Sequence, residues 1–264
     1  MKKYLLLMMT LAVACTQAPP KENQIAITAH RGFWDSAVAR GAQNSIASLG
    51  SAQAIGVWGT EFDLQLTVDD IVLVNHDEER EGLRIADHPY ATFAAMSLPN
   101  GEHPSTLDEY LSQGALSPVV MVVELKPLSS PEREDLLIGK TLSSLKAHGM
   151  LDPTKVLFIS FSLYTCERLA ALCPGFTVQY LEGDKTPEEL NELGINGLDY
   201  EFNVLNEHPD YVERAHALGM SVNVWTVDAR EDLERMIELG VDCLTTNAPL
   251  LARELLGERE LTVR

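Results

Sequence analysis

The sequence predicts an α/β fold: a TIM-type (β/α)8 barrel with an extra antiparallel hairpin strand and a small insertion after that strand. Three observations predict this fold class. Short apolar runs of strand length alternate with amphipathic helical stretches, which is typical of parallel strands joined by helices. Polar residues stand at the ends of several runs, where such barrels carry their active sites. No glycine-rich phosphate loop follows the first run, although the alternative, a doubly wound open sheet, would favour one.

Nine apolar runs are strand candidates, one more than an eight-stranded barrel needs. They are residues 25–30, 60–65, 71–77, 119–126, 155–161, 176–181, 197–202, 221–227 and 241–247. Only a few residues around Asp70 join the second run to the third, and so short a link permits a hairpin but no parallel crossover. With residues 71–77 counted as the extra strand, eight parallel strands remain. We therefore expect one barrel domain over residues 24–264, with residues 78–118 as an insertion-like excursion.

Helix and cysteine patterns agree with this reading. Several amphipathic stretches between the runs end in a glycine placed to close a helix, and Thr106 and Glu109 have the spacing of a capping box. Cys166 and Cys173 would lie about 10 Å apart along a helix, which is too far for a disulfide. Their spacing does not suit zinc either, so we expect these thiols and Cys243 to be small buried hydrophobes.

The N-terminal residues have the pattern of an export signal. Two lysines precede an apolar stretch and then small residues, and the stretch is too short to span a membrane. A cysteine after a small residue favours a lipoprotein signal over residues 1–14, with lipidation at Cys15, although Ala12 stands where leucine is usual. The A-x-A pattern of residues 12–14 also fits ordinary secretion. The polar residues 15–23 favour a lipidated tether, hence an exported, membrane-anchored envelope protein, periplasmic or at the surface.

Composition limits the partners of this protein. The 264 residues are 45% apolar, enough for a sizeable core, and their formal net charge is −19. Nucleic acids are bound by Lys and Arg side chains that displace counterions, so we expect no nucleic-acid partner. An anionic substrate would need a local positive centre that overcomes the unfavourable field of the whole protein.

Three carboxylates stand at predicted strand ends. Glu61 and Asp63 are two residues apart on one strand, so they point the same way about 7 Å apart, and Glu124 ends the next barrel strand. An acidic pair on a strand is more often a solvated face, but carboxylates inside a barrel are costly unless paired or bound to a metal. Oxygen ligands of this kind suit one divalent cation, Ca²⁺ or Mg²⁺.

Basic side chains accompany these carboxylates in the sequence. Arg31 and Lys126 can bind an oxyanion beside the cation, the first as a planar fork and the second as a point charge. His30 and His76 can transfer protons near neutral pH. A divalent cation with flanking cations and two histidines suggests phosphoryl chemistry.

Eight segments then occur in a fixed order: ITAHRGFW, AQNSIASLGSAQAIG, GTEFDLQLTVDDIVLVNHDE, LPNGEHPSTLDEYL, VVELKP, FISFS, NVWTVD and GVDCLTTNAP. Together they resemble the glycerophosphodiester phosphodiesterase family, in its bacterial, exported lipoprotein form, from about residue 26 to residue 250. The resemblance implies a TIM-type barrel that splits a glycerophosphodiester into an alcohol and glycerol 3-phosphate, with Ca²⁺ or Mg²⁺ as the cofactor.

The resemblance also implies roles for the residues that match the motifs of this family. Glu61, Asp63 and Glu124 match the metal ligands. His30 and His76 match the general acid and base, without an indication of which residue is the acid and which is the base.

Four further residues match substrate-binding positions by the same resemblance. Arg31 and Lys126 match the phosphate-binding cations. Trp225 matches an aromatic wall beside the glycerol, and Phe161 lines the same mouth. In the family mechanism the glycerol 2-hydroxyl attacks phosphorus, and water then opens the resulting cyclic phosphate.

Four positions depart from the family pattern. Gln43 stands in place of a glutamate that could orient Arg31, and Asp70 stands in place of a turn glycine. Asp228 stands where the family has asparagine, and Asn247 where it has aspartate. None of the four is an implied metal ligand or proton carrier, so the departures bear on substrate preference more than on reaction class.

Two other functions stay open on the sequence. One is a cyclising phospholipase or lyase on the same barrel, which would release a cyclic phosphate. The other is an inactive envelope lipoprotein that binds glycerophospho head groups. The presence of both histidines and all three carboxylates favours the phosphodiesterase.

Overall fold

The computed structural model describes residues 24–258 and 262–263. The predicted signal peptide and tether, with the lipidation site Cys15, lie outside the described residues. Within the described part of the chain, no helix is long and apolar enough to cross a membrane.

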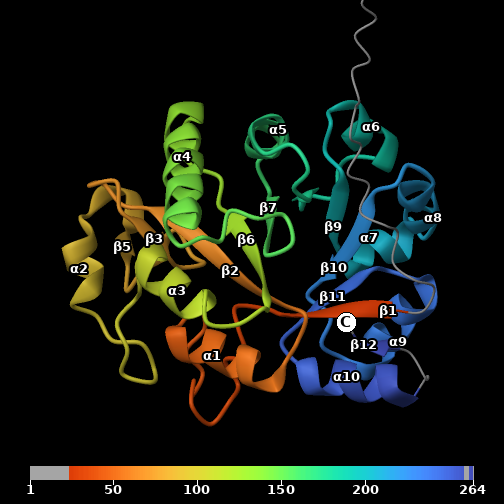
Figure 1. Ribbon diagram of the computed structural model, residues 1–264, viewed down its shortest axis with the longest axis horizontal. Helices are drawn as coiled ribbons and strands as arrows, with labels where there is room; N and C mark the ends of the chain where they lie inside the picture. The colour runs from red at the N-terminus through yellow and green to blue at the C-terminus, as the bar shows by residue number, and fades with distance from the viewer. Residues whose placement is uncertain (1–23, 259–261, 264) are drawn as a thin grey trace, which may run out of the picture.

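Eight parallel strands form a closed ring, which confirms the predicted barrel (Figure 1). In ring order they are β1 (Gln24–Ala29), β2 (Gly59–Leu66), β6 (Val120–Leu125), β7 (Val156–Ser160), β8 (Val178–Tyr180), β9 (Gly197–Glu201), β10 (Ser221–Trp225) and β11 (Cys243–Thr246). The ring closes because β1 pairs with β11 on one side and with β2 on the other, Thr28 lying opposite Thr245 and Gly59.

The extra strand is β3 (Val72–Val74), which lies outside the ring and pairs antiparallel with the end of β2. The hairpin between them turns at Asp70, whose φ of 61° is a left-handed conformation in which Asp and Asn are among the more tolerant residues. Arg133 fixes this turn by donating to Asp70 at 2.5 Å and to the backbone oxygen of Thr67 at 2.8 Å. A further short strand, β12 (Thr262–Val263), pairs with the beginning of β1.

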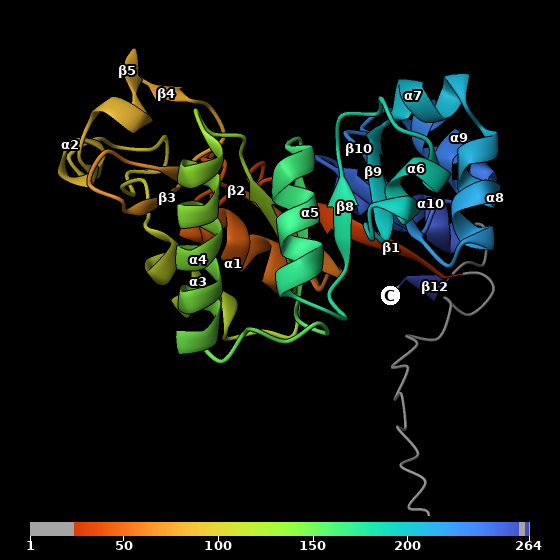
Figure 2. The same cartoon turned by 90° about the horizontal axis from the view of Figure 1, so that it is seen from above.

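Helices surround the ring and alternate with its strands (Figures 1 and 2). They are α1 (Ile46–Ile55), α3 (Leu107–Gly114), α4 (Pro131–Ala147), α5 (Leu163–Leu172), α6 (Pro187–Glu192), α7 (Phe202–Glu207), α8 (Asp210–Ala217), α9 (Arg230–Leu239) and α10 (Pro249–Glu258). The predicted capping box is present, since Thr106 and Glu109 satisfy each other's backbone N–H groups at the start of α3. Helices α1 and α9 end at Gly56 and Gly240 with φ of 65° and 84°, as the glycine pattern predicts.

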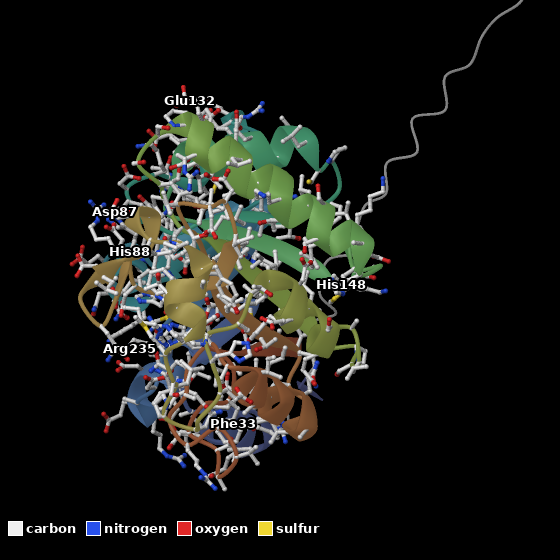
Figure 3. All side chains as sticks on the ribbon, turned by 90° about the vertical axis from the view of Figure 1, so that its left-hand side faces the viewer. Phe33, Asp87, His88, Glu132, His148 and Arg235 are labelled. Atoms are coloured by element: carbon white, nitrogen blue, oxygen red, sulfur yellow. The ribbon has the colours of Figure 1, made fainter. Side chains whose placement is uncertain are left out.

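The segment between β3 and β6 begins with small elements beside β3 and ends in α3. The small elements are β4 (Glu79–Arg80), β5 (Leu83–Arg84), the 3₁₀ helix η1 (Ile85–Asp87) and α2 (Tyr90–Ala94), set to one side of the barrel in Figure 2. Ile85 and Phe93 pack with Leu73 of β3 in an apolar cluster of their own. Figure 3 shows the same side, with His88 beside Asp87 and with α4 running from near Glu132 to His148.

The main core lies between the strands and the outer helices, as expected for a two-layer α/β barrel. Inside the ring, one side is apolar and is built from Val122, Leu157, Ile159 and Leu181. Cys166, Cys173 and Cys243 are buried thiols, as predicted.

Candidate active site

The three predicted carboxylates converge at the carboxyl ends of two neighbouring strands. Because β2 and β6 pair in parallel, Asp63 lies directly opposite Glu124. Glu61 lies two residues before Asp63 on β2 and therefore on the same face of the strand. The side chains are buried, with Glu61, Asp63 and Glu124 at 2%, 1% and 6% exposure. One oxygen from each lies within 4.8 Å of the others, so the cluster could bind a metal ion.

Burial and mutual repulsion make this cluster unfavourable without a positive charge. Burial, followed by the charges of the other two carboxylates, raises the pKa of Glu61 well above its usual value. Burial and the Asp63 charge raise the pKa of Glu124 to about 8. Burial opposes ionisation of Asp63 as well, but the Lys126 ammonium, His76 and the hydrogen bond from Asn44 together outweigh it and hold the pKa of Asp63 at about 2. The site therefore carries fixed negative charge at Asp63 and favours a cation beside it.

Lys126 follows β6 and provides a local positive charge within the site. Its Nζ lies 2.8 Å from Asp63 Oδ1 and 2.6 Å from Glu124 Oε1. The same ammonium lies 5.8 Å from the ring centroid of Phe161, which meets Trp225 edge to face at 5.5 Å. Phe161 and Trp225, the predicted aromatic wall, thus lie beside Lys126, the predicted phosphate-binding lysine, at the same end of the barrel.

Arg31 lies in the turn directly after β1. Its backbone has a φ of 55°, and its N–H donates to Glu61 Oε2 at 2.8 Å. The guanidinium donates from Nη1 to Gln43 Oε1 at 2.8 Å, and its Nε lies 3.8 Å from Asp63 Oδ2. The next residue must be glycine, because a Cβ on Gly32 would lie 2.5 Å from the Oγ of Ser48 in α1. This turn therefore fixes the guanidinium beside the carboxylates.

The two predicted proton-transfer residues come from different elements. His30 Nδ1 lies 2.9 Å from Asn247 Oδ1, and its Nε2 lies 4.0 Å from Glu61 Oε2. Burial and the neighbouring Arg31 charge lower the pKa of His30 to about 4, so its imidazole is neutral at pH 7. His76 follows β3, and its Nδ1 lies 2.7 Å from Asp77 Oδ1.

His76 reaches the site because the hairpin turns the chain back toward the ends of the barrel strands. It borders a hollow at the surface that is lined by Gln65, His76, Asp77, Glu78, Lys126 and Pro127. Burial lowers the pKa of this histidine, although Asp63 opposes that shift. The structure thus brings His76 and Lys126 together at one cavity, although 50 residues separate them in the sequence.

The donor set fits a hard divalent cation. All three ligands offer carboxylate oxygens, which suit Ca²⁺ or Mg²⁺ better than metals that prefer sulphur or imidazole. Glu61 Oε1 is buried and has no hydrogen-bond partner among the described residues. Buried polar atoms are nearly always satisfied, so an unpaired carboxylate oxygen that faces two others indicates a place for a cation.

Sequence reasoning missed several residues that support the site. Asn44 donates from Nδ2 to Asp63 Oδ2 at 2.7 Å, and its Oδ1 accepts from the Asp63 backbone at 3.3 Å. Trp34 Nε1 donates to Asn247 Oδ1 at 2.9 Å. Asn44 lies in one of the segments that carry the family resemblance, but the sequence assigned it no role; asparagine tolerates the left-handed φ of 55° that the turn imposes.

Comparisons with known proteins agree with this geometry. Residues 30–251 match the model of the Glycerophosphoryl diester phosphodiesterase family. A crystal structure of a glycerophosphodiester phosphodiesterase from Parabacteroides distasonis ATCC 8503 is 38% identical, with a TM-score of 0.87 over 91% of this chain and 99% of that one. A glycerophosphodiester phosphodiesterase of Caldanaerobacter subterraneus subsp. tengcongensis is 27% identical over 225 residues, which are 78% of this chain and 89% of that protein.

A third relative was solved with a ligand. The structure of an Oleispira antarctica phosphodiesterase in complex with the product sn-glycerol-3-phosphate has a TM-score of 0.76 at 23% identity, covering 88% of this chain and 96% of that one. At that identity the likeness shows the shared barrel fold. The family model, by contrast, spans most of this chain. The chain therefore belongs to the glycerophosphoryl diester phosphodiesterase family, which confirms the family and enzyme class predicted from its sequence.

Proposed function

We propose that this chain hydrolyses glycerophosphodiesters to an alcohol and glycerol 3-phosphate with the help of one divalent cation, Ca²⁺ or Mg²⁺. The observation that carries the proposal is the convergence of Glu61, Asp63 and Glu124 beside Lys126 and Arg31. Such a site binds a cation and an anion side by side, which is what a phosphodiester and its metal require. The product bound by the Oleispira relative supports the same substrate class.

Glu61, Asp63 and Glu124 would hold the cation. When bound, it would neutralise negative charge on the non-bridging oxygens of the phosphate. Arg31 and Lys126 bind the remaining phosphate oxygens, the first through a planar pair of N–H donors and the second through its ammonium. Trp225 and Phe161 form the apolar wall against which the glycerol carbons pack.

His30 and His76 move the protons. In the first step the glycerol 2-hydroxyl attacks phosphorus, one histidine accepts the hydroxyl proton, and the other donates a proton to the departing alcohol oxygen. In the second step water opens the cyclic phosphate and the proton transfers run in reverse, giving glycerol 3-phosphate. The attacking hydroxyl belongs to the substrate itself, so the first step gains from proximity.

We also propose that the mature protein is exported and held at the cell envelope by a lipid on Cys15. Support comes from the N-terminal sequence: a basic start, an apolar stretch, small residues and then the cysteine. Radiolabelled palmitate incorporated into the wild type but not into Cys15→Ser would support the anchor. Equal labelling of both proteins would contradict it.

The test of the activity is a product assay on metal-stripped protein. We would treat the protein with EDTA, restore Ca²⁺ or Mg²⁺ in parallel, and measure glycerol 3-phosphate release from the choline, ethanolamine, glycerol and inositol glycerophosphodiesters. Release that depends on added cation supports the proposal. Accumulation of the cyclic phosphate would indicate the cyclising lyase. Ligand binding without either product would indicate the inactive binding protein.

A further inference from the structure

A chain of hydrogen bonds leads from His30 through Asn247 to Asp228. Asn247 Oδ1 lies 2.9 Å from His30 Nδ1 and 2.9 Å from Trp34 Nε1. On the other side of the amide, Asn247 Nδ2 donates to Asp228 Oδ2 at 2.8 Å. Asp228 also accepts from the Asn247 backbone N–H at 2.7 Å and from Thr246 Oγ1 at 3.1 Å.

The chemistry of the partners fixes the orientation of the Asn247 amide. The indole N–H of Trp34 is only a donor, so the Asn247 atom that it contacts must be the oxygen. A carboxylate is only an acceptor, so the Asn247 atom that contacts Asp228 must be the NH₂ group. Each neighbour independently excludes the flipped amide, because a flip would place two donors together at Trp34 and two acceptors together at Asp228.

The orientation of the Asn247 amide in turn determines which ring nitrogen of His30 carries the hydrogen. Since Asn247 presents an oxygen to His30, Nδ1 of the imidazole must carry a hydrogen and donate it. A neutral imidazole with a hydrogen on Nδ1 has its lone pair on Nε2. That nitrogen is the one that faces the carboxylate cluster, 4.0 Å from Glu61 Oε2.

We propose that Asp228 is a positioning residue that fixes the amide of Asn247 and, through it, holds His30 as the Nδ1–H tautomer with Nε2 facing the substrate. The catalytic consequence rests on the proposed function: His30 is the group that accepts the proton of the attacking hydroxyl, through Nε2. Trp34 acts with Asp228, from the opposite side of the same amide.

The proposal explains together two departures from the family pattern, Asp228 and Asn247. This chain has a carboxylate at position 228 and an amide at position 247, whereas the family resemblance implies an amide at 228 and a carboxylate at 247. An aspartate at 247 would accept directly from the histidine, and an asparagine at 228 would donate to that aspartate. Asn247 and Asp228 therefore exchange chemical roles, and a donor still faces an acceptor at every contact.

The test is a reciprocal exchange of the two residues. Asp228→Asn removes the acceptor that holds the Asn247 NH₂ group, and Asn247→Asp sets two carboxylates against each other at 2.8 Å. We expect each single variant to lower kcat about tenfold or more, while KM and cation affinity change little. The double variant Asp228→Asn/Asn247→Asp restores a donor and an acceptor at each contact, and we expect it to recover most of kcat.

Asp242→Asn is the matched control. Asp242 also accepts from a histidine, His216 Nε2 at 3.0 Å, and from a backbone N–H, that of Val222 at 2.8 Å, but it precedes β11 at the opposite end from the site. Its substitution should leave kcat unchanged. Losses that multiply in the double variant, or an equal loss in the control, would overturn the proposal.

A spectroscopic measurement keeps the proposal testable even where a variant folds poorly. Nitrogen-15 NMR of the histidine side chains in the wild-type protein distinguishes protonated from lone-pair ring nitrogens, and His30→Gln identifies the His30 signals. We expect a protonated Nδ1 and an unprotonated Nε2 near neutral pH. A protonated Nε2 with an unprotonated Nδ1 contradicts the proposal whether or not the enzyme is active. Conversely, the expected tautomer in a protein without turnover would refute the proposed function alone.

Discussion

The Arg31 guanidinium donates from Nη1 to the side-chain oxygen of Gln43 at 2.8 Å. The family resemblance implies a glutamate at position 43. In this chain the neutral amide of Gln43 accepts the hydrogen bond that the carboxylate would accept. The bond keeps Arg31 in place, with its Nε 3.8 Å from Asp63 Oδ2. A hydrogen bond to a carboxylate would be charge-assisted and stronger, but it would also add negative charge beside the phosphate site.

We expect Gln43→Ala to lower kcat/KM for glycerophosphodiesters by about tenfold or less, because one hydrogen bond that orients Arg31 is lost. Gln43→Glu keeps an acceptor in the same place and should stay within a few-fold of the wild type. Steady-state kinetics on the three proteins check this. A Gln43→Ala enzyme with unchanged kcat/KM would show that Arg31 does not depend on this partner.

Substitution of Glu61 by glutamine should stabilise the cation-free protein while it abolishes turnover. Burial and two neighbouring carboxylates raise the pKa of Glu61, so its ionised form opposes folding at neutral pH. Glutamine keeps an oxygen that can accept from the Arg31 backbone. In EDTA we expect a Tm about 2–4 °C higher for each 1 kcal/mol of relieved repulsion.

Calorimetry with and without the cation checks this prediction, and Glu213→Gln on the exposed part of α8 is the control for loss of surface charge. The bound cation should stabilise the wild type more than Glu61→Gln. If Glu61→Gln is less stable than the wild type in EDTA, repulsion among the three carboxylates does not destabilise the cation-free protein.

A change of leaving group should affect the rates of the His30→Ala and His76→Ala variants differently. An alcohol needs a proton to depart, whereas p-nitrophenolate leaves without one. Each alanine variant should lose about 10²–10⁴-fold on a natural substrate. On a p-nitrophenyl glycerophosphodiester, His76→Ala should recover much of its rate, because His76 donates to the leaving group, and His30→Ala should not. Recovery in His30→Ala instead would reverse the two assignments.

A third histidine gives a pH effect on stability that is independent of catalysis. The hydrogen bond to Asp242 raises the pKa of His216 above its usual 6.5. The folded state then holds the proton more tightly than the unfolded chain, so the contact stabilises the protein below about pH 6.5 and loses its effect as pH rises through the folded-state pKa. His216→Gln should therefore lower Tm more at pH 5.5 than at pH 8.5. An equal effect at both pH values would show that the protonated pair does not contribute.

The barrel was predictable because its signals are local. Each strand is an apolar run, and the link at Asp70 is too short for a crossover, which leaves eight parallel strands and one hairpin strand. The carboxylates were predictable because Glu61 and Asp63 share a strand face, and Glu124 ends the next strand. Parallel strands of a barrel bring such ends together.

The supporting residues could not be predicted, because their partners are distant in the sequence. Asn44 contacts Asp63 across 19 residues, and Asn247 contacts His30 across 217. The first contact depends on β1 lying beside β2, and the second on the closure of the ring, in which β1 lies beside β11. The sequence marked Asn247 only as a departure from a pattern, and its role requires the position of Asp228, which the fold supplies.

The most direct test of the central claim is a calorimetric titration of Ca²⁺ and Mg²⁺ onto metal-stripped wild type and onto Asp63→Ala, with glycerol 3-phosphate release measured on the same samples. Asp63 carries the fixed negative charge of the cluster, so its removal should abolish binding while the barrel still folds. We predict one cation per wild-type chain, with turnover that rises as that site fills, and neither binding nor turnover in the variant. Cation binding of equal strength in Asp63→Ala, or full turnover in EDTA, would contradict the account.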